Sequence, residues 1–215
     1  MTRTKARILA AMGATLLGGC ILGYYVLPWT VAVPDMPAVE STAVTDRHGE
    51  FLGLLPGEDN YRCEPLPPGA LPQNVVRALL AVEDKRFFSH GGMDFLAIGR
   101  AAWKRMRGTS RSGASTLTMQ LAKLANEQEA VAQGETRPKR DMRSKIRESL
   151  QARRWEMSHD KEWLLRQYLN RVDFGNLCHG VETAARFYFG KHAHELDIAE
   201  AALLAGMVQA PARLD

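Results

Sequence analysis

The segment from Val82 to Asp94 gathers the residue types that proton transfer and anion binding need. It holds adjacent carboxylates at Glu83 and Asp84, a cation, a histidine and a Gly-Gly pair. The preceding residues 73–81 show helical apolar spacing, and Glu83 continues that apolar stripe. A carboxylate at the end of a helix opposes the helix dipole. A general base and an ordinary solvated charge both remain open at this point.

A second group of polar side chains follows a Gly/Ser-rich break at residues 108–113. Ser115 is a candidate N-cap for the helix that begins there. On that helix Thr116, Gln120 and Lys123 share one face because they are three or four residues apart. The pattern fits the wall of a polar site, and it fits equally a capped amphipathic helix with one face in water.

A third group lies on the helix predicted for residues 141–157. Lys145 and Glu148 are three residues apart and face the same way, whereas Arg143 is expected to point elsewhere. An exposed ion pair contributes less than about 1 kcal/mol to stability. The spacing by itself therefore does not distinguish a functional site from an ordinary helix surface.

The chain as a whole predicts a membrane anchor followed by one domain of moderate size. Its 215 residues include an uncharged run from Ile8 to Trp29, long enough for a bilayer, which needs about 20 residues. Basic residues before the run keep the N-terminus in the cytoplasm. We expect an anchor at 1–30, a linker at 31–40 and the domain at 41–215. A cleaved signal peptide or lipoprotein processing at Cys20 is the alternative, but the apolar run continues past that cysteine.

Composition excludes some classes of protein. The formal net charge of +4 is too small to indicate a nucleic-acid partner. The three cysteines, Cys20, Cys63 and Cys178, are too few for a disulfide scaffold. Whether Cys63 and Cys178 pair is left open by the sequence.

Local patterns divide the domain into a β-hairpin and a series of helices. Residues 41–45 and 51–55 are predicted as the two hairpin strands. The polar stretch 125–140 is predicted as an exposed loop. Apolar positions on two of the helices are expected to make packing contacts: Leu96, Ile98, Trp103, Met142, Ile146, Leu150 and Trp155. Helices are predicted at 73–81, 95–106, from 116 onward, and at 141–157, 161–170, 180–189 and 196–207.

These segments resemble the motifs of the peptidoglycan glycosyltransferases. That family, glycosyltransferase family 51, comprises the lysozyme-like transglycosylase domain of class A penicillin-binding proteins and its monofunctional relatives. The resemblance covers the chain roughly from Thr42 onward. The first motif, Glu-Asp-x-x-Phe-x-x-His-x-Gly-x-Asp, is matched at all of its specified positions by Glu83, Asp84, Phe87, His90, Gly92 and Asp94.

The later motifs appear in the order of the family, with two departures. The second motif, Gly-x-Ser-Thr-x-Thr-x-Gln, ends at Gln120, and Met119 stands where many members carry Gln, as in the penicillin-binding protein 1C branch. The third, Arg-Lys-x-x-Glu, has Ser144 in place of its arginine. The fourth motif matches 161–170, where a structural role in the core is favoured and Asn170 is expected to bond to backbone.

The resemblance implies a mainly α, lysozyme-like domain with a small β-hairpin at its start and a transmembrane helix before it. It also implies a reaction in which a sugar hydroxyl attacks the anomeric carbon of a lipid-linked disaccharide-peptide and displaces polyprenyl diphosphate. One displacement inverts the anomeric centre. An unperturbed glutamate, with a pKa of about 4.3, is ionised at neutral pH and can take the hydroxyl proton.

Roles follow from that reaction. Glu83 is the expected base, and Glu148 orients Lys145 or assists at the anomeric centre. Cations that stabilise the leaving diphosphate and groups that bind substrate are expected at Asp84, Arg86, Ser115, Thr116, Gln120, Lys123 and Lys145. His90 is expected to be structural. No metal site and no cofactor are required, although a divalent cation, Mg²⁺ or Mn²⁺, could bridge the pyrophosphate and Asp84 or Glu148.

The same resemblance implies partners and a location. The partners are lipid II and the growing glycan strand, the bilayer, and a separate transpeptidase or other cell-wall assembly protein, but not nucleic acid. The location is the bacterial inner membrane, crossed once, with the catalytic domain outside the cytoplasm.

Two other functions are weighed against polymerisation. A lysozyme-like lytic enzyme would need an acid to protonate a poor leaving group, whereas the set Arg86, Lys123 and Lys145 favours a diphosphate. A non-catalytic cell-wall assembly partner would explain the substitution at Ser144 and the long polar stretch.

Overall fold

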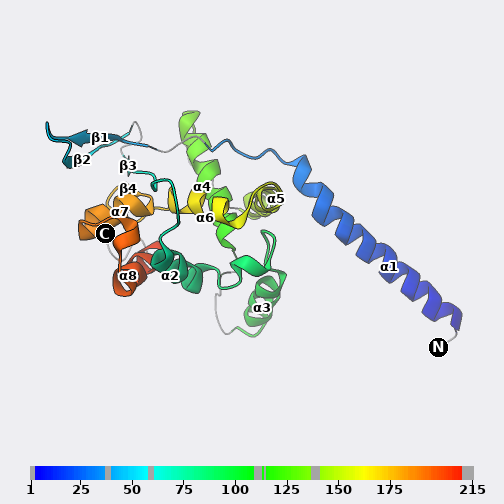
Figure 1. Ribbon diagram of the computed structural model, residues 1–215. Helices are drawn as coiled ribbons and strands as arrows, with labels where there is room; N and C mark the ends of the chain where they lie inside the picture. Colours follow the sequence, from blue (N-terminus) through cyan, green and yellow to red (C-terminus); the bar gives the residue numbers. More distant parts are fainter. Residues whose placement is uncertain are drawn as a thin grey trace.

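The protein is mainly helical, as the sequence predicts, and carries two small sheets. The computed structural model describes residues 3–36, 40–57, 61–108, 113, 115–136 and 141–209. A long first helix projects from one end of a helical body, and a β-hairpin stands at the opposite end (Figure 1).

The first helix, α1, spans Arg3–Val26 and runs into the short 3-10 helix η1, Leu27–Thr30. The segment Met12–Thr30 is the one stretch of the described chain that is long and apolar enough to cross a membrane. The chain that follows this segment packs against the domain. Val33 and Met36 pack against the core, within the segment expected to be a linker.

The predicted hairpin is confirmed. Strand β1, Thr42–Thr45, pairs antiparallel with β2, Phe51–Leu55, with an irregularity between Val44 and Thr45. The turn between the strands is closed by Asp46, whose Oδ1 accepts hydrogen bonds from two backbone N–H groups.

A second, parallel pair was not predicted. It joins β3, Arg62–Cys63, to β4, Cys178–His179, with Cys63 opposite His179 and Arg62 opposite Cys178. Neighbouring residues on a strand point to opposite faces, so the two cysteine side chains leave the sheet on different sides. Both cysteines are buried, and neither forms a disulfide.

Helices form the rest of the domain. The core joins α2 to α8 and α4 to both α5 and α6. Its fully buried side chains include Leu79, Leu117, Leu121, Leu164, Tyr168 and Leu204. The helix bounds are α2 Gln73–Glu83, η2 Phe87–Ser89, α3 Phe95–Met106, α4 Leu117–Ala132, α5 Met142–Ser158, α6 Lys161–Leu169, α7 Val181–Phe189, η3 Ala193–Glu195 and α8 Ile198–Gln209.

The prediction of an exposed loop at residues 125–140 is wrong for the first half of that stretch, because α4 continues to Ala132. Alanine, glutamate and glutamine are strong helix formers, and they dominate this stretch. The helix ends just before Gly134, whose φ of 72° suits glycine after a helix terminus. Residues 137–140 lie outside the described chain.

Several apolar residues that were expected to pack are exposed instead. Leu96, Ile98 and Trp103 on α3 are 59%, 40% and 56% exposed, and no residue of α3 is buried. Met142 and Ile146 on α5 are exposed too, whereas Trp155 is in the core. Periodicity identified the apolar face of each helix but could not say what lies against it.

Glycine is needed where the loop after η2 crosses α5. Gly92 has a φ of 92°, and a Cβ there would lie 2.8 Å from the backbone N of Arg153 and 2.9 Å from the carbonyl carbon of Ala152. Neither backbone atom can move without shifting α5. The close approach therefore fixes the distance between this loop and the helix.

We predict that Gly92→Ala lowers the free energy of unfolding by about 2–4 kcal/mol, from the unfavourable φ and the overpacking together. Gly134→Ala is the matched control, because its φ is also positive but nothing lies within 4 Å of its added Cβ. The control should cost only about 1–2 kcal/mol. Equal losses in the two variants, measured by denaturant unfolding, would contradict the packing argument.

Candidate active site

Glu83 is the last residue of α2 and is held by a chain of side chains. Its Oε2 accepts a hydrogen bond of 2.7 Å from Nε2 of Gln120, on α4. Oε1 of Gln120 in turn accepts one of 3.2 Å from the hydroxyl of Tyr168, on α6. Burial and the negative charge of Glu83 raise the pKa of Tyr168 far above its ordinary value. The hydroxyl therefore stays protonated and can donate, which orients the amide of Gln120 toward Glu83.

Tyr168 was predicted to be a core residue, and it is fully buried. Sequence reasoning missed its link to Glu83. A signal was present, because tyrosine carries a hydroxyl that usually finds a hydrogen-bond partner when buried, but nothing in the sequence named that partner.

Asp84, the neighbour of Glu83, is 7% exposed and bonded within the protein. Nε2 of His90 lies 3.0 and 3.1 Å from its two carboxylate oxygens. Oδ2 also accepts the backbone N–H of Leu117, the first residue of α4, at 3.0 Å. The carboxylate predicted to bind substrate thus joins the end of α2 to the start of α4 and to the loop between η2 and α3.

Arg86 is paired with Asp94 at 3.0 Å and is 37% exposed. Asp94 caps α3 by accepting the N–H groups of Leu96 and Ala97. Burial alone would raise the pKa of Asp94, but the hydrogen bond from Ala97 and the charge of Arg86 outweigh it, so the pKa is lowered. The cation predicted to bind diphosphate therefore contacts a structural carboxylate in this state.

The N-cap of α4 is Thr116, not Ser115 as expected. The Thr116 hydroxyl accepts the N–H of Met119 at 3.2 Å and donates to the carbonyl of Gly92 at 2.6 Å. Its backbone is extended, with φ −82° and ψ 165°, and the helix begins one residue later. The cap therefore also ties the first motif to the second, whereas Ser115 lies half-buried before it.

A cavity of about 270 Å³ lies between α4 and α5. Its lining residues are Lys123, Asn126, Glu127, Arg143, Ser144, Arg147 and Glu148. Lys123 forms an ion pair of 3.5 Å with Glu127, and Glu148 is only 6% exposed. The cavity thus combines three basic groups with two carboxylates.

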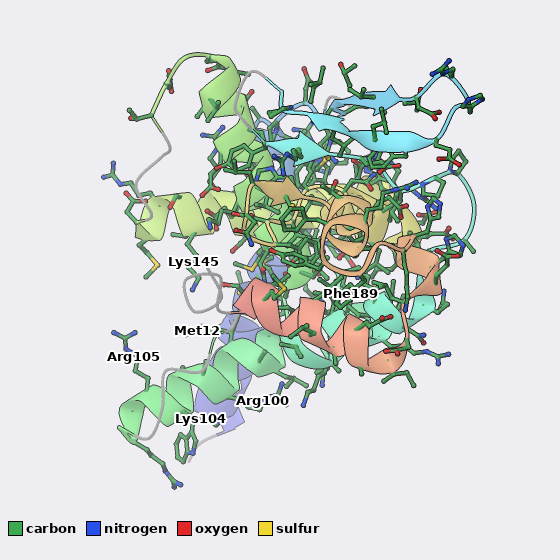
Figure 2. All side chains as sticks on the ribbon, turned by 90° about the vertical axis from the view of Figure 1, so that its left-hand side faces the viewer. Met12, Arg100, Lys104, Arg105, Lys145 and Phe189 are labelled. Atoms are coloured by element: carbon green, nitrogen blue, oxygen red, sulfur yellow. The ribbon has the colours of Figure 1, made fainter. Side chains whose placement is uncertain are left out.

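Two of the basic lining residues were not among the predicted site residues. Arg143, expected to point elsewhere, lines the cavity together with Arg147, because residues four apart lie in one row on a helix. Both side chains are exposed, and within the described ranges neither has a carboxylate partner. Lys145 does not line the cavity. Figure 2 shows Lys145 extending toward the end of the molecule that carries α3.

Helix α4 connects the carboxylate at Glu83 to this cavity. Gln120, which holds Glu83, is one turn before Lys123, which lines the cavity. Glu83 itself is not among the lining residues. Within the described part of the chain, no group of three or more His, Cys, Asp or Glu residues is placed to hold a metal ion.

Comparisons with known proteins agree with these motifs. A family model described as Transglycosylase matches residues 49–215. The chain is 33% identical to penicillin-binding protein 1A of Aquifex aeolicus over 219 residues, covering 97% of this chain and 28% of that protein. It is 33% identical to penicillin-binding protein 1A of Streptococcus oralis, covering 95% and 31%. For the Pseudomonas aeruginosa protein of the same name, identity is 32% with coverage of 93% and 24%. The chain therefore spans about a quarter to a third of the length of these relatives.

We predict that Asp84→Ala destabilises the fold by about 2–4 kcal/mol, because a buried histidine and a backbone N–H lose their partner. The apparent midpoint of thermal unfolding should fall by about 5–15 °C. Glu83→Gln, one residue earlier, is the control and should change it by less than about 2 °C. If Asp84→Ala unfolds at the wild-type temperature, its bonds are not structural.

Proposed function

Because the chain belongs to the Transglycosylase family, we propose that it is a membrane-bound peptidoglycan glycosyltransferase. It joins lipid-linked disaccharide-peptide units into glycan strands and releases polyprenyl diphosphate. The observation that carries this proposal is the arrangement along α4. The amide of Gln120 holds Glu83, and Lys123 one turn later lines a basic cavity. One helix, α4, thus both orients the base at the end of α2 and lines the cationic site.

Glu83 acts as the general base. Its carboxylate takes the proton of the acceptor hydroxyl as the new glycosidic bond forms at the anomeric carbon of the donor. Gln120 fixes one carboxylate oxygen, so the group meets the hydroxyl in a defined orientation. A single displacement of this kind inverts the anomeric centre.

The cavity between α4 and α5 takes the diphosphate of the donor. Lys123, Arg143 and Arg147 provide charge-assisted hydrogen bonds where negative charge grows as the leaving group departs. In the third motif Ser144 stands where the family has arginine, and the guanidinium groups of Arg143 and Arg147 supply that charge instead. Buried Glu148 sits in the same lining and stays the candidate for assistance at the anomeric carbon.

A divalent ion at the diphosphate would be held by carboxylates. Of the two residues considered for this, Glu148 lines the cavity, as does Glu127. Asp84 is bonded to His90 and Leu117 and does not line it. A bound Mg²⁺ or Mn²⁺ would add to the charge that neutralises the leaving group, and Glu148 and Glu127 would hold it.

The location proposed is the bacterial inner membrane, with the N-terminus in the cytoplasm and the domain outside. The candidate span and the basic residues before it support this topology. Helix α3 supports contact with the bilayer, because Phe95, Trp103 and Met106 are more than half exposed. The same helix also carries basic side chains, as Figure 2 shows for Arg100, Lys104 and Arg105. A transpeptidase is the proposed partner that would cross-link the product.

We predict that the full chain, given lipid-linked disaccharide-peptide in detergent, forms polymer and that Glu83→Gln abolishes it while unfolding at the wild-type temperature. Polymer would be measured by gel separation of labelled product. Turnover by Glu83→Gln at the wild-type rate would refute the base assignment. Release of fragments from preformed glycan would favour a lytic enzyme, and substrate binding without turnover by the wild type would favour an assembly partner.

A second prediction tests the cations. Arg143→Ala and Arg147→Ala should each lower kcat/KM by about tenfold, and the double variant by about a hundredfold, because each charge-assisted bond contributes roughly 1.5–3 kcal/mol. Arg47→Ala, in the exposed hairpin turn, is the control and should be neutral. Adding Ser144→Arg to the double variant should restore part of the loss. Wild-type kcat/KM in the double variant would show that the diphosphate binds elsewhere.

A further inference from the structure

The outer end of α1 contacts the loop that follows the candidate base. The hydroxyl of Tyr24 donates to the carbonyl of Gly91 at 3.2 Å. The guanidinium carbon of Arg153, on α5, lies 4.0 Å from the centre of the Tyr24 ring, and the ring of Phe95 lies 5.8 Å from it. The end of the apolar helix is therefore packed against the domain.

The chain beyond Tyr24 stays against α5. Arg154 Nη1 donates to the carbonyl of Val31 at 2.6 Å and its guanidinium lies 5.2 Å from the ring of Trp29. Gln151 Nε2 donates to the carbonyl of Ala32 at 2.8 Å. Contacts from one turn of α5, residues 151–154, make the junction between α1 and the domain a packed interface, not a loose tether.

Side chains donate to three successive carbonyls of the contacted loop. Lys161 donates to His90 O at 2.8 Å and Thr116 to Gly92 O at 2.6 Å, whereas Gly91 O accepts from both Tyr24 and Arg153, at 3.2 and 3.5 Å. These donors belong to α6, the N-cap of α4, α1 and α5. Tyr24 is thus the contribution of the membrane helix to a loop otherwise held from within the domain.

This loop is connected to the candidate base over a short path. His90 bonds to Asp84, and Asp84 follows Glu83 directly in the sequence. Tyr24 and Arg153 both touch this loop at Gly91: each donates to its carbonyl, and an added Cβ there would meet Arg153 Nη1 and lie 3.1 Å from the hydroxyl of Tyr24. A shift of Tyr24 or Arg153 therefore moves the loop, and with it the pair that borders Glu83.

We propose that Tyr24 and Arg153 are positioning residues, through which the outer end of the membrane helix fixes the loop 90–92 beside the base. The inference rests on the proposed function and deepens it. The anchor then does more than keep the enzyme near a lipid-linked substrate, because it supplies part of the support of the active site. A hydrogen bond and a stacked cation at a partly buried site are together strong enough to change the population of an ordered loop about five- to thirtyfold.

The test compares variants of the full chain in bilayer nanodiscs. Tyr24→Leu removes both the hydroxyl and the ring, and should lower kcat about five- to thirtyfold with KM changed less than about twofold. Tyr24→Phe keeps the ring over Arg153 and should lose only about two- to fivefold. Leu22→Ala, at an exposed position on the same helix, is the control and should leave kcat unchanged. Wild-type kcat in Tyr24→Leu, or a loss of thermal stability with wild-type kcat per folded molecule, would overturn the proposal.

Hydrogen exchange provides an arm that needs no turnover. The backbone amides of residues 89–92 should exchange about five- to thirtyfold faster in Tyr24→Leu than in the wild type, and those of Leu22→Ala at the wild-type rate. Unchanged exchange would overturn the positioning role even if polymer forms. Faster exchange in a protein that forms no polymer would support the contact while refuting the proposed function, so the two failures are distinguishable.

Discussion

The geometry of the candidate site depends on one buried carboxylate. Asp84 accepts hydrogen bonds from His90 and from the N–H of Leu117, and so joins the end of α2 to the loop before α3 and to the start of α4. A buried charge is tolerated only when it is paired and bonded, so these segments cannot separate without a large cost. Glu83 takes its position from this constraint, because it precedes Asp84 on the last turn of α2.

Helix α4 is the element on which the chemistry converges. Its N-cap Thr116 bonds to the first motif, its Gln120 holds Glu83, and its Lys123 faces the cavity shared with α5. Because these positions are three or four residues apart, one rigid helix sets their spacing. Tyr168 supports the arrangement from α6 by orienting the Gln120 amide. Successive residues on the polar face of α4 therefore have different neighbours: the first motif, Glu83 and the cavity.

Helix α1, the candidate membrane span, and the domain form one packed unit on the side of α5. Arg153 stacks on Tyr24 near the end of α1 and Arg154 on Trp29 in η1, and the loop at Gly91 accepts hydrogen bonds from Tyr24 and Arg153. Lysine or arginine over an aromatic ring is a common way to combine a polar and an apolar environment, and an interface between a bilayer and water presents both. The position of the candidate site relative to α1 is thereby set by specific contacts.

The sequence by itself determined the hairpin, most of the helices and the motifs of the family. Helical periodicity located α2, α3 and α5 within one or two residues, and alternation located the hairpin, because these patterns depend only on neighbours along the chain. It could not determine which face of α3 is covered, since exposure depends on what packs against the helix. It also misjudged the start and length of α4, where a cap was decided by a contact with Gly92.

Only the tertiary structure decided which candidate residues face the site and which are bonded within the protein as structural groups. Glu83 and Asp84 are neighbours in the sequence, yet one is held at the edge of the site and the other is buried as a structural bridge. Arg143 and Arg147 face a cavity while Lys145, between them, does not. The reason is physical. Burial, charge pairing and access to a cavity are properties of distant segments brought together, and one chain segment carries no information about its neighbours in space.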